Sequence, residues 1–499
     1  MAVDVIVAGG GPVGMMAAAL LDAAGVSVEV YERDAEPGHD SRATTVHPRT
    51  LEVLTLLEQD GRRVSDILVA QGMSVPHTHF AMLPDELDYR DLDTPFPFVL
   101  RIPQWRTEQV LADHLRARGV PVHRGAEVTE VGQSGDEVWV RAGGARRTAQ
   151  YLVGADGAHS LVRKAAGIGF IGSVPNTVGF VADVHLAEPV TGARYFWNET
   201  AGHAAVVPLG DNIIRIFGAE PTGTGLAADQ VRDRQAEPFT LAELSAALIR
   251  ICGSDFGVHR PVWMSRSSNT SRHAERYRNG RILLVGDAAH VHLPAGGQGL
   301  NVGLQDATNL AWKLAAEING WAPDRLRTGA FSYDSERRPI AARLLANTLA
   351  QDALMHTFSP AGAALRGMIT EFIARRGEFA ADLAGWMSGL AVGYQPPEGA
   401  HPLVGTKAPD LMLSEDTLLR SLRPDRFVLL DFTGDLPELG SARVRMVSAH
   451  RPAAWDGVRA VLIRPDGHVA YATDTGAGLA EEVAAWTEPD RPLVPARGQ

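Results

Sequence analysis

The sequence predicts an α/β fold with an inserted antiparallel sheet and a second, smaller α/β region at the C-terminal end. Three observations predict it. Short Val-rich runs alternate with helical patterns in residues 1–177 and 266–393. Between them, residues 178–265 contain runs of alternating polar and apolar side chains, which are typical of antiparallel strands. After a Pro- and Gly-rich stretch at 394–410, residues 411–499 contain further strand patterns.

The composition is that of a soluble globular protein of two or three domains, because 45% of the 499 residues are hydrophobic and 21% are charged. The net charge of −12 is spread along the chain, which argues against nucleic acid or an anionic membrane as a partner. Cys252 is the single cysteine, so disulfide chemistry within the chain is excluded and a cytoplasmic location is expected. The uncharged run at 5–21 contains several glycines and lacks a basic flank, so we expect neither a signal peptide nor a membrane span.

Residues 3–33 predict a strand, a glycine turn, a helix and a second strand. In the turn, Gly9 permits a tight bend, Gly11 lets the backbone approach a pyrophosphate, and Gly14 lets the helix pack closely on the sheet. The helix N-terminus offers free N–H groups to phosphates. Glu32 ends the second strand, where a carboxylate can accept hydrogen bonds from ribose hydroxyls. We interpret the unit as a dinucleotide site; a purely structural turn is the alternative.

The chain then continues with a predicted helix at 105–119 and short strands at 126–153. The stretch GADGAHSLVRKAAG (154–167) again places a carboxylate, Asp156, between a strand and a helix. Capping of that helix by Asp156 and its neighbours is the alternative to a binding role, and it is favoured when the stretch is taken alone.

In the middle region, the stretch AVVPLGDNIIRIF predicts a hairpin that turns at 210–212. In a regular strand, Arg215 shares a face with Ile213 and Phe217. The aromatic run 195–197 is interpreted as core packing, with the lining of an aromatic pocket as the second interpretation.

A third strand end occurs in VGDAAHVHLPAGGQGLN (285–301), which precedes a predicted helix at 300–318. Asp287 can accept hydrogen bonds from a polyol chain, and Pro294 with the following glycines lets backbone contact a flat ring. The helix N-terminus favours negative charge on such a ring by about 0.3–2 kcal/mol. A glycine-rich loop of a hydrolase is the alternative, but no nucleophile elbow accompanies it.

Metal binding is not expected. The pairs His290/His292 and His77/His79 have a spacing that places both rings on one side of an extended segment, but no carboxylate or cysteine completes a ligand set.

In chain order, GGGPVG, GADG and GDAAHVHLPAGGQGLN resemble the motifs of the class A flavin monooxygenases, the para-hydroxybenzoate hydroxylase group. With IPQWRTEQVL and RPDGHVAYA, the chain is similar over nearly its whole length to aromatic polyketide hydroxylases of the angucycline and anthracycline type and to rifampicin monooxygenases. The resemblance implies this layout: a Rossmann-like FAD-binding domain (1–177 and 266–393), a substrate domain (178–265, with 75–103), a linker (394–410) and a thioredoxin-like domain (411–499) that is not redox active.

The resemblance also implies FAD as cofactor, NADPH and O2 as co-substrates, an aromatic polyketide as substrate and a possible homodimer. Hydroxylation would proceed through a C4a-hydroperoxyflavin. No second nucleotide fingerprint is present, so NADPH would bind without a domain of its own. The flavin would then move between two positions, and the glycines at 296–299 would leave room for one of them.

Cofactor contacts are implied, residue by residue, for Gly9, Gly11, Pro12, Val13, Gly14, Glu32, Arg33, Arg42, Gln104, Val128, Asp156, Gly286, Asp287, Pro294, Gly297, Gly299, Leu300 and Asn301. Among them, Glu32 would bind the adenosine ribose, Arg42 the flavin or its phosphates, and Gln104 the cofactor chain. Asp156 would be shared by FAD and the reduced nucleotide. Asp287 would hold the ribityl chain, and 294–301 would border the isoalloxazine.

The predicted catalytic residues are Arg215, Arg42 and Pro294. Oxygen transfer favours a phenolate over a phenol, so a nearby cation is expected, and Arg215 is the candidate for that cation or for a group that orients the flavin. A solvated arginine on the outer sheet face is the alternative. The transfer also requires an apolar pocket between the sheet and the flavin.

Two further functions remain open on the sequence. Baeyer–Villiger oxygenation of a polyketide ketone shares every cofactor motif, and a non-catalytic flavin-binding or scaffolding protein is the alternative from another class. A flavin dehydrogenase or halogenase is disfavoured, because neither a cysteine pair nor a halogenase signature is present.

Overall fold

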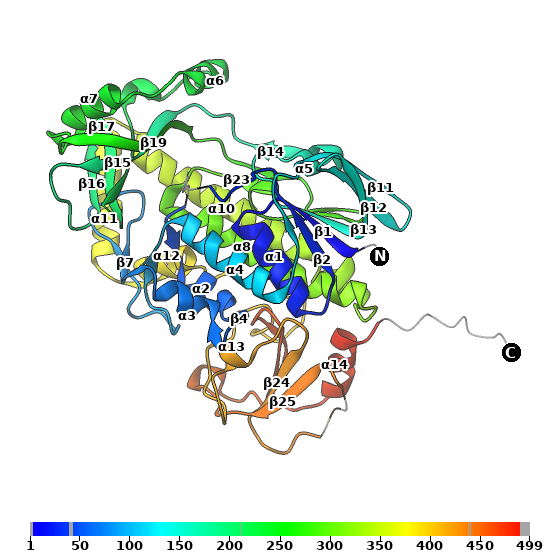
Figure 1. The fold of residues 1–499 in the computed structure, drawn as a ribbon. Coiled ribbons are helices and arrows are strands. Elements are labelled where there is room, and N and C mark those ends of the chain that lie inside the picture. Colours follow the sequence, from blue (N-terminus) through cyan, green and yellow to red (C-terminus); the bar gives the residue numbers. More distant parts are fainter. Residues whose placement is uncertain (1–2, 39–42, 211, 438, 440, 490–499) are drawn as a thin grey trace.

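A mixed sheet lies beside helices α1 (Pro12–Ala23) and α8 (Gln298–Ile318) in the computed structural model, which describes residues 3–38, 43–210, 212–437, 439 and 441–489 (Figure 1). Four neighbouring strands of this sheet are parallel: β2 (Val28–Tyr31), β1 (Val3–Ala8), β13 (Ala145–Gly154) and β22 (Ile282–Leu284). Strand β10 (Val122–His123) extends the sheet beyond β2 in parallel, and β12 (Glu137–Ala142) and β11 (Val128–Ser134) extend it antiparallel beyond β13. The predicted order of strand, turn, helix and strand at the N-terminal end is confirmed.

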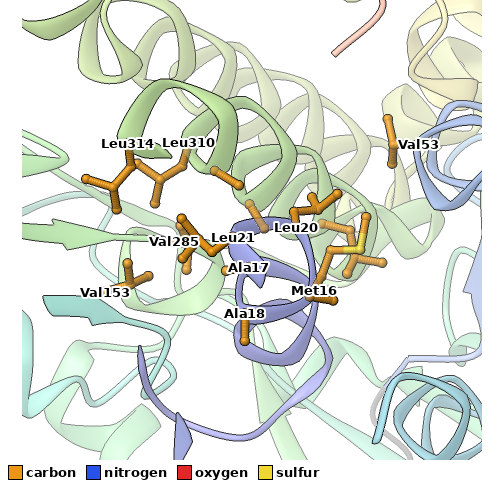
Figure 2. Packing of buried hydrophobic residues seen from close by; sticks show 14 of the residues in the cluster. Met16, Ala17, Ala18, Leu20, Leu21, Val53, Val153, Val285, Leu310 and Leu314 are labelled. Atoms are coloured by element: carbon orange, nitrogen blue, oxygen red, sulfur yellow. The ribbon is translucent and has the colours of Figure 1, made fainter. Parts of the chain in front are cut away.

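Two helices that lie far apart in the sequence pack together against this sheet. Helix α1 (Pro12–Ala23) begins with a proline at its first position, where the missing N–H has no intrahelical partner to lose. Helix α8 (Gln298–Ile318) includes the predicted segment 300–318. The two helices contact each other along their length, and Leu20 and Leu21 of α1 and Leu310 and Leu314 of α8 all belong to the main core (Figure 2).

The carboxyl ends of the parallel strands lie side by side. Ala8 pairs with Gly154 on one side and with Tyr31 on the other, and Gly154 pairs with Leu284. Because each strand runs directly into one of the predicted motifs, the sheet register brings all three glycine turns and the end of β2 to one edge.

The inserted region is a five-stranded antiparallel sheet in the order β16 (Arg194–Asn198), β17 (Gly202–Gly210), β18 (Ile213–Ala219), β15 (Val178–Leu186) and β19 (Val258–Ser268). The predicted hairpin is confirmed, because β17 pairs with β18 up to Gly210 opposite Ile213. Ile214 and Ile216 pack under helix α7 (Leu241–Cys252). The alternate residues of β18 therefore face the glycine turns.

Several smaller elements complete the part of the fold that surrounds the site. They are the sheet of β3 (Thr45–Val46), β9 (Val99–Arg101) and β6 (Met73–Val75), helix α4 (Gln104–Arg118), and helices α10 (Tyr333–His356), α11 (Pro360–Ala374) and α12 (Glu378–Ser388). Within the described ranges, we find no helix whose length and apolar character would suit a bilayer crossing.

The C-terminal region forms its own four-stranded sheet in the order β25 (Val444–Ser448), β24 (Phe427–Asp431), β26 (Ala460–Ile463) and β27 (Val469–Thr473), with helix α14 (Leu479–Thr487) beside it. The Pro- and Gly-rich stretch at 394–410 contains no helix or strand, as its composition predicts. It is nevertheless buried at Tyr394 and Val404, and the Gly405 N–H donates to the Val469 carbonyl. This stretch is therefore packed against the C-terminal sheet and is not a free tether.

A turn of the C-terminal region, residues 464–468, places buried charged side chains against helices of the main domain. Arg464 is fully buried and donates to Glu336 Oε1 at 2.6 Å and to Oε2 at 2.9 Å. Its guanidinium also pairs with Asp466 Oδ2 at 2.5 Å. Lys313 Nζ donates to Glu336 Oε2 at 2.5 Å. Because Glu336 and Lys313 lie on α10 and α8, the C-terminal region is joined to the main domain by buried ion pairs.

Replacing Arg464 tests how much this turn contributes to the free energy of unfolding. Arg464→Met leaves Asp466 without its guanidinium partner, and it leaves Glu336 with Lys313 as its one charged partner among the described residues, beside the amide of Asn309. Removing one partner of a buried pair costs about 3–5 kcal/mol. We expect a loss of that size in the free energy of unfolding, measured by urea denaturation. The matched control is Arg426→Met, which breaks an exposed pair with Asp425 and should cost less than about 1 kcal/mol. Equal losses in the two variants would contradict the role of the turn.

Candidate cofactor site and adjoining chamber

The first two glycine turns are in direct contact. Gly9 has φ +111°, and a Cβ there would collide with the carbonyl of Ala155 in the second turn. A Cβ at Gly14 would collide with the carbonyl of Gly9. Gly11 differs, because an added Cβ would meet nothing within 4 Å. Two glycines thus close the turn by packing, whereas Gly11 borders open space at the N-terminus of α1.

Val13 joins the first turn to the third. A Cβ added at Gly286 would lie 3.1 Å from Val13 Cγ1, and Gly303 of α8 also borders Val13. Pro12 and Val13 form the first turn of α1. The predicted residues of the first and third motifs are therefore brought together, although about 270 positions separate them in the sequence.

Glu32 and Gln104 bind backbone groups near the first turn. Glu32 Oε2 accepts from the Gly10 N–H at 2.6 Å, so the predicted ribose acceptor also holds the glycine turn against the end of β2. Gln104 accepts from the Ala43 N–H at 2.9 Å and donates to Glu108 at 2.7 Å. Glu32 Oε1 also accepts from the Asp34 N–H at 2.9 Å, and because each carboxylate oxygen has two lone pairs, Glu32 retains acceptor capacity for a ligand.

The structure adds little about the predicted cofactor contacts of three other residues. Arg33 is exposed, with its Nε 3.7 Å from Asp34 Oδ1, and Val128 is the first residue of β11. Arg42 lies outside the described residues.

Asp156 caps the helix that follows it. Its Oδ1 accepts from Ser160 Oγ at 2.5 Å, and its Oδ2 accepts from the Val162 N–H at 3.0 Å. The capping interpretation of this motif is therefore the one that the geometry displays, and a contact with two nucleotides stays a prediction. Sequence reasoning missed Arg163, which is buried and donates to the carbonyls of Ala288 and Ala158 at 2.9 and 3.1 Å. Arg163 ties the second motif to the third.

In the third turn, Asp287 is exposed between buried neighbours, at the end of β22. Behind it, the buried carboxylate of Asp306 accepts from the Gly286 N–H at 3.3 Å, pairs with His290 Nε2 at 2.7 Å and accepts from Arg337 Nε at 2.7 Å. Burial alone would raise the pKa of Asp306, but the charge of Arg337 and the contact with His290 hold it below its usual value. His290 therefore has a buried carboxylate as its hydrogen-bond partner.

The loop that begins at Pro294 enters α8 through two left-handed glycines, Gly296 and Gly297. We expected these glycines to leave room for a flavin position, and this expectation is wrong. A Cβ at Gly296 would collide with Met387 Cε, and one at Gly297 would collide with Thr45 Oγ1, so protein atoms already fill the space beside them. Both glycines are required for backbone conformation and close packing.

Asn301 holds this loop in place. Its Nδ2 donates to the carbonyls of Gly297 at 2.8 Å and Thr45 at 3.0 Å, and its Oδ1 accepts from the His47 N–H at 2.7 Å. Leu300 packs against the main core, and a Cβ at Gly299 would lie 3.2 Å from His292 Nε2. The first N–H groups of α8 have no intrahelical acceptors, which makes this end of the loop suited to an anionic or polar ring edge.

His47 is a further residue that sequence reasoning missed. Its Nε2 lies 2.8 Å from the Gly296 carbonyl, and its Nδ1 lies 3.4 Å from the Tyr89 hydroxyl. Burial lowers the pKa of His47 to about 4, so the ring is neutral at physiological pH. The carbonyl can only accept, so Nε2 carries the proton and Nδ1 accepts from Tyr89.

An apolar cluster of side chains lies between this loop and the inserted sheet, where the sequence predicts the substrate pocket. Leu293 and Ala295 of the loop belong to the same cluster as Val207 and Phe217 of the sheet. The other members include Phe80, Met82, Leu83, Tyr89, Val99, Met355, Ile373, Ala384 and Met387. We call this cluster the chamber wall.

The aromatic run at 195–197 divides between two environments. Tyr195 packs against the chamber wall, which agrees with the second interpretation of the run. Phe196 packs on the other side of the sheet under α7, and the Trp197 Nε1–H donates to the Met355 carbonyl at 2.9 Å. One ring of the three therefore borders the chamber, and the other two are structural.

Arg215 lies on the chamber face of β18, between Val207 and Asp183 of the neighbouring strands. Its side chain donates to Asp183 Oδ1 at 2.8 Å and to Oδ2 at 2.7 Å, and it is 5% exposed. The alternative of a solvated arginine on the outer face is wrong. Its charge is compensated by Asp183, so this pair offers little net positive charge to a ligand.

Comparison with known proteins gives the same picture over the whole length. A family model described as FAD binding domain matches residues 2–348, and one described as aromatic-ring hydroxylase, C-terminal, matches residues 401–489. A rifampicin monooxygenase of Streptomyces venezuelae is 39% identical, with 97% of this chain and 98% of the relative covered. A dialkyldecalin synthase of Streptomyces rugosporus is 37% identical, with 98% and 100% covered.

Among solved structures, the OxyS anhydrotetracycline hydroxylase from Streptomyces rimosus superposes with a TM-score of 0.87 at 38% identity, covering 98% of this chain and 100% of that one. The residues at the sheet edge fit an FAD: Gly11 faces open space at a helix N-terminus, and Asp287 presents an exposed carboxylate.

The open space at Gly11 allows binding to be separated from folding. In the free chain, Gly11→Ala meets no neighbour and keeps an ordinary backbone conformation, so we expect thermal stability without FAD to stay unchanged. We expect FAD affinity to fall at least about tenfold, because a methyl group there keeps the pyrophosphate from the backbone. Fluorescence titration of the apoprotein measures this. The control is Gly367→Ala, which also meets nothing within 4 Å. Unchanged FAD affinity in Gly11→Ala would place the pyrophosphate elsewhere.

Proposed function

Because the chain belongs to the family of FAD-dependent aromatic-ring monooxygenases, we propose that it hydroxylates an aromatic polyketide or a related polycyclic phenol. The reaction consumes NAD(P)H and O2 and balances as substrate–H plus O2, NADPH and a proton, giving substrate–OH, water and NADP⁺. One observation supports the proposal: three glycine turns meet at one sheet edge, and the loop that follows the third packs against an apolar cluster shared with the inserted sheet.

FAD would be held by residues of all three turns. Gly11 and the N-terminus of α1 would receive the pyrophosphate, and Glu32 the adenosine ribose. Asp287 would bind the ribityl chain, and 294–301 would border the isoalloxazine. When bound, FAD supplies two-electron uptake from the reduced nucleotide and the activation of O2.

The protein's own contributions are orientation and exclusion of water. The N–H groups at the start of α8 favour negative charge on the ring edge beside them by about 0.3–2 kcal/mol. His47 donates to the Gly296 carbonyl and keeps the loop shape that presents these groups. The chamber wall replaces water with side chains such as Leu293, Val207 and Phe217, and a reactive oxygen species decays without product when water reaches it.

A second candidate function has a specific observation in its favour. The relative named dialkyldecalin synthase matches this chain end to end, so the family includes a protein named for synthesis rather than oxygenation. In that case the chain would bind FAD and a polycyclic substrate without net oxygenation. Baeyer–Villiger insertion into a ketone is the third option, and it shares all the cofactor-binding residues.

The assembly and the location of the protein are also part of the proposal. We infer a cytoplasmic enzyme, because the single cysteine, Cys252, suits a reducing compartment. A homodimer is proposed by analogy with the family, and light scattering of the purified protein tests it.

Product analysis distinguishes the three functions. We expect a panel of polycyclic phenols to accelerate NADPH oxidation by the FAD-loaded protein, and we expect one product to be heavier by one oxygen atom that derives from labelled O2. NMR then separates a new hydroxyl group from a lactone. The Gly11→Ala variant, poor in FAD, is the matched control. A product isomeric with its substrate, formed without NADPH, would favour the synthase function and end the hydroxylase proposal.

The pair of Arg215 and Asp183 can be tested without leaving a buried charge. Replacing both, as Arg215→Met with Asp183→Leu, exchanges an ion pair for apolar side chains and is expected to keep the fold and FAD content. If Arg215 orients the flavin or the substrate, the fraction of NADPH that yields product falls at least about threefold in the double variant, and the release of hydrogen peroxide rises correspondingly. A loss of about 1.4 kcal/mol in orientation energy would lower that fraction about tenfold. Coupling equal to that of the unmodified enzyme would end this role for Arg215.

A further inference from the structure

Arg101 occupies the central strand of the small sheet β3–β9–β6. Thr45 of β3 and Met73 of β6 lie directly opposite it, and opposite residues of antiparallel strands share a face. The Thr45 hydroxyl donates to the Gly297 carbonyl at 3.4 Å, so this face meets the loop at the start of α8. Val99, two residues before Arg101, belongs to the chamber wall. Arg101 therefore emerges on the chamber side of the sheet.

The charge of Arg101 differs from that of Arg215 in having no counter-ion within the part of the chain that the structure describes. Among the described residues, its half-buried side chain makes no ion pair or hydrogen bond. The charge of Arg101 affects the pKa of two nearby groups, His79 and Tyr195. Burial and, to a smaller extent, the charge of Arg101 lower the pKa of His79 to about 4. Burial raises the pKa of Tyr195 to about 12, although the charge of Arg101 opposes the rise. Both groups are therefore neutral at physiological pH.

His79 and Tyr195 present polar atoms beside this cation. Their ring centroids are 4.7 Å apart. His79 Nδ1 accepts from the Met82 N–H at 3.2 Å, so the neutral ring carries its proton on Nε2. Neither that N–H nor the Tyr195 hydroxyl has a hydrogen-bond partner within the described part of the chain. One end of the chamber wall therefore offers a cation and two neutral donors, none of which has an acceptor among the described residues.

We propose that Arg101 is the cation that binds the ionised oxygen of the substrate, a phenolate or enolate of a polycyclic ring, with the His79 N–H and the Tyr195 hydroxyl as additional donors. The inference rests on the proposed function and names the substrate group that the chamber recognises. On binding, the hydroxyl O–H bond breaks, its electron pair stays on oxygen, and the proton leaves to solvent. The anion makes the ring more electron-rich at the carbons that accept oxygen.

The charges around this oxygen favour that assignment. The groups whose charge or ring reaches His79 or Tyr195 are Arg101, Glu86 and His47. Glu86 is exposed to solvent, which screens its charge, and His47 is neutral. Arg215 is paired with Asp183. Arg101 is thus the one uncompensated cation among these groups, and an opposite charge within about 4–6 Å lowers a pKa by about 1–3 units.

The ionisation of a bound dye measures this effect without turnover. Alizarin, a dihydroxyanthraquinone, changes colour when it ionises, and its bound form is followed at wavelengths where oxidised FAD does not absorb. We expect the apparent pKa of alizarin bound to the FAD-loaded enzyme to lie below that of the free dye. In Arg101→Gln it should rise by about one unit or more. Arg101→Lys should retain most of the shift, and Tyr195→Phe should reduce it in part.

The matched control is Arg194→Gln, which removes an exposed arginine adjacent to Tyr195 and should leave the dye's pKa unchanged. An unchanged dye pKa in Arg101→Gln would overturn the proposal, and so would loss of FAD in that variant, because the guanidinium would then serve the cofactor. If the wild-type enzyme still oxygenated a polycyclic phenol, the proposed function would stand. A wild-type enzyme that neither binds the dye nor oxygenates any polycyclic phenol would overturn both.

Discussion

The buried carboxylate of Asp306 is the interaction on which the arrangement of the site depends. It holds the backbone of the third turn at Gly286 and fixes His290 on one side, and it meets Arg337 on the other. A buried ion is tolerated only when its partners are in place, since its desolvation costs several kcal/mol. The position of the exposed Asp287 is therefore set by charges that lie behind it, in the interior.

The N-terminal motif and the helix at 300–318 could be predicted from sequence because their signals are local. Glycine spacing, a proline at a helix start and an apolar periodicity are all contained within one element. The meeting of the three turns also follows, since parallel strands that end in similar motifs end at one edge. The hairpin at 210–212 was predicted for the same reason, from two runs of alternating residues joined by a turn.

The side-chain contacts that could not be predicted depend on how segments far apart in the sequence are aligned with one another. Asp183 faces Arg215 only because β15 pairs with β18 in one particular alignment, and neither residue carries a local mark of that pairing. Arg163 and His47 act on carbonyl groups 125 and 249 positions away. The glycines at 296 and 297 show the converse error: a glycine signals close approach, but sequence does not say whether a ligand or a neighbouring side chain approaches.

The buried turn at 464–468 has a consequence for how such a chain can change over time. Residues 411–499 contain no cysteine, so thiol chemistry does not constrain the sequence of this C-terminal region. The arginine and aspartate at its tip, however, neutralise charges that belong to helices of the central domain. We therefore expect the acquisition of such a C-terminal region to be difficult to reverse in evolution. Once the interior of the central domain contains charged side chains that the C-terminal region neutralises, deletion of that region no longer gives back the ancestral domain.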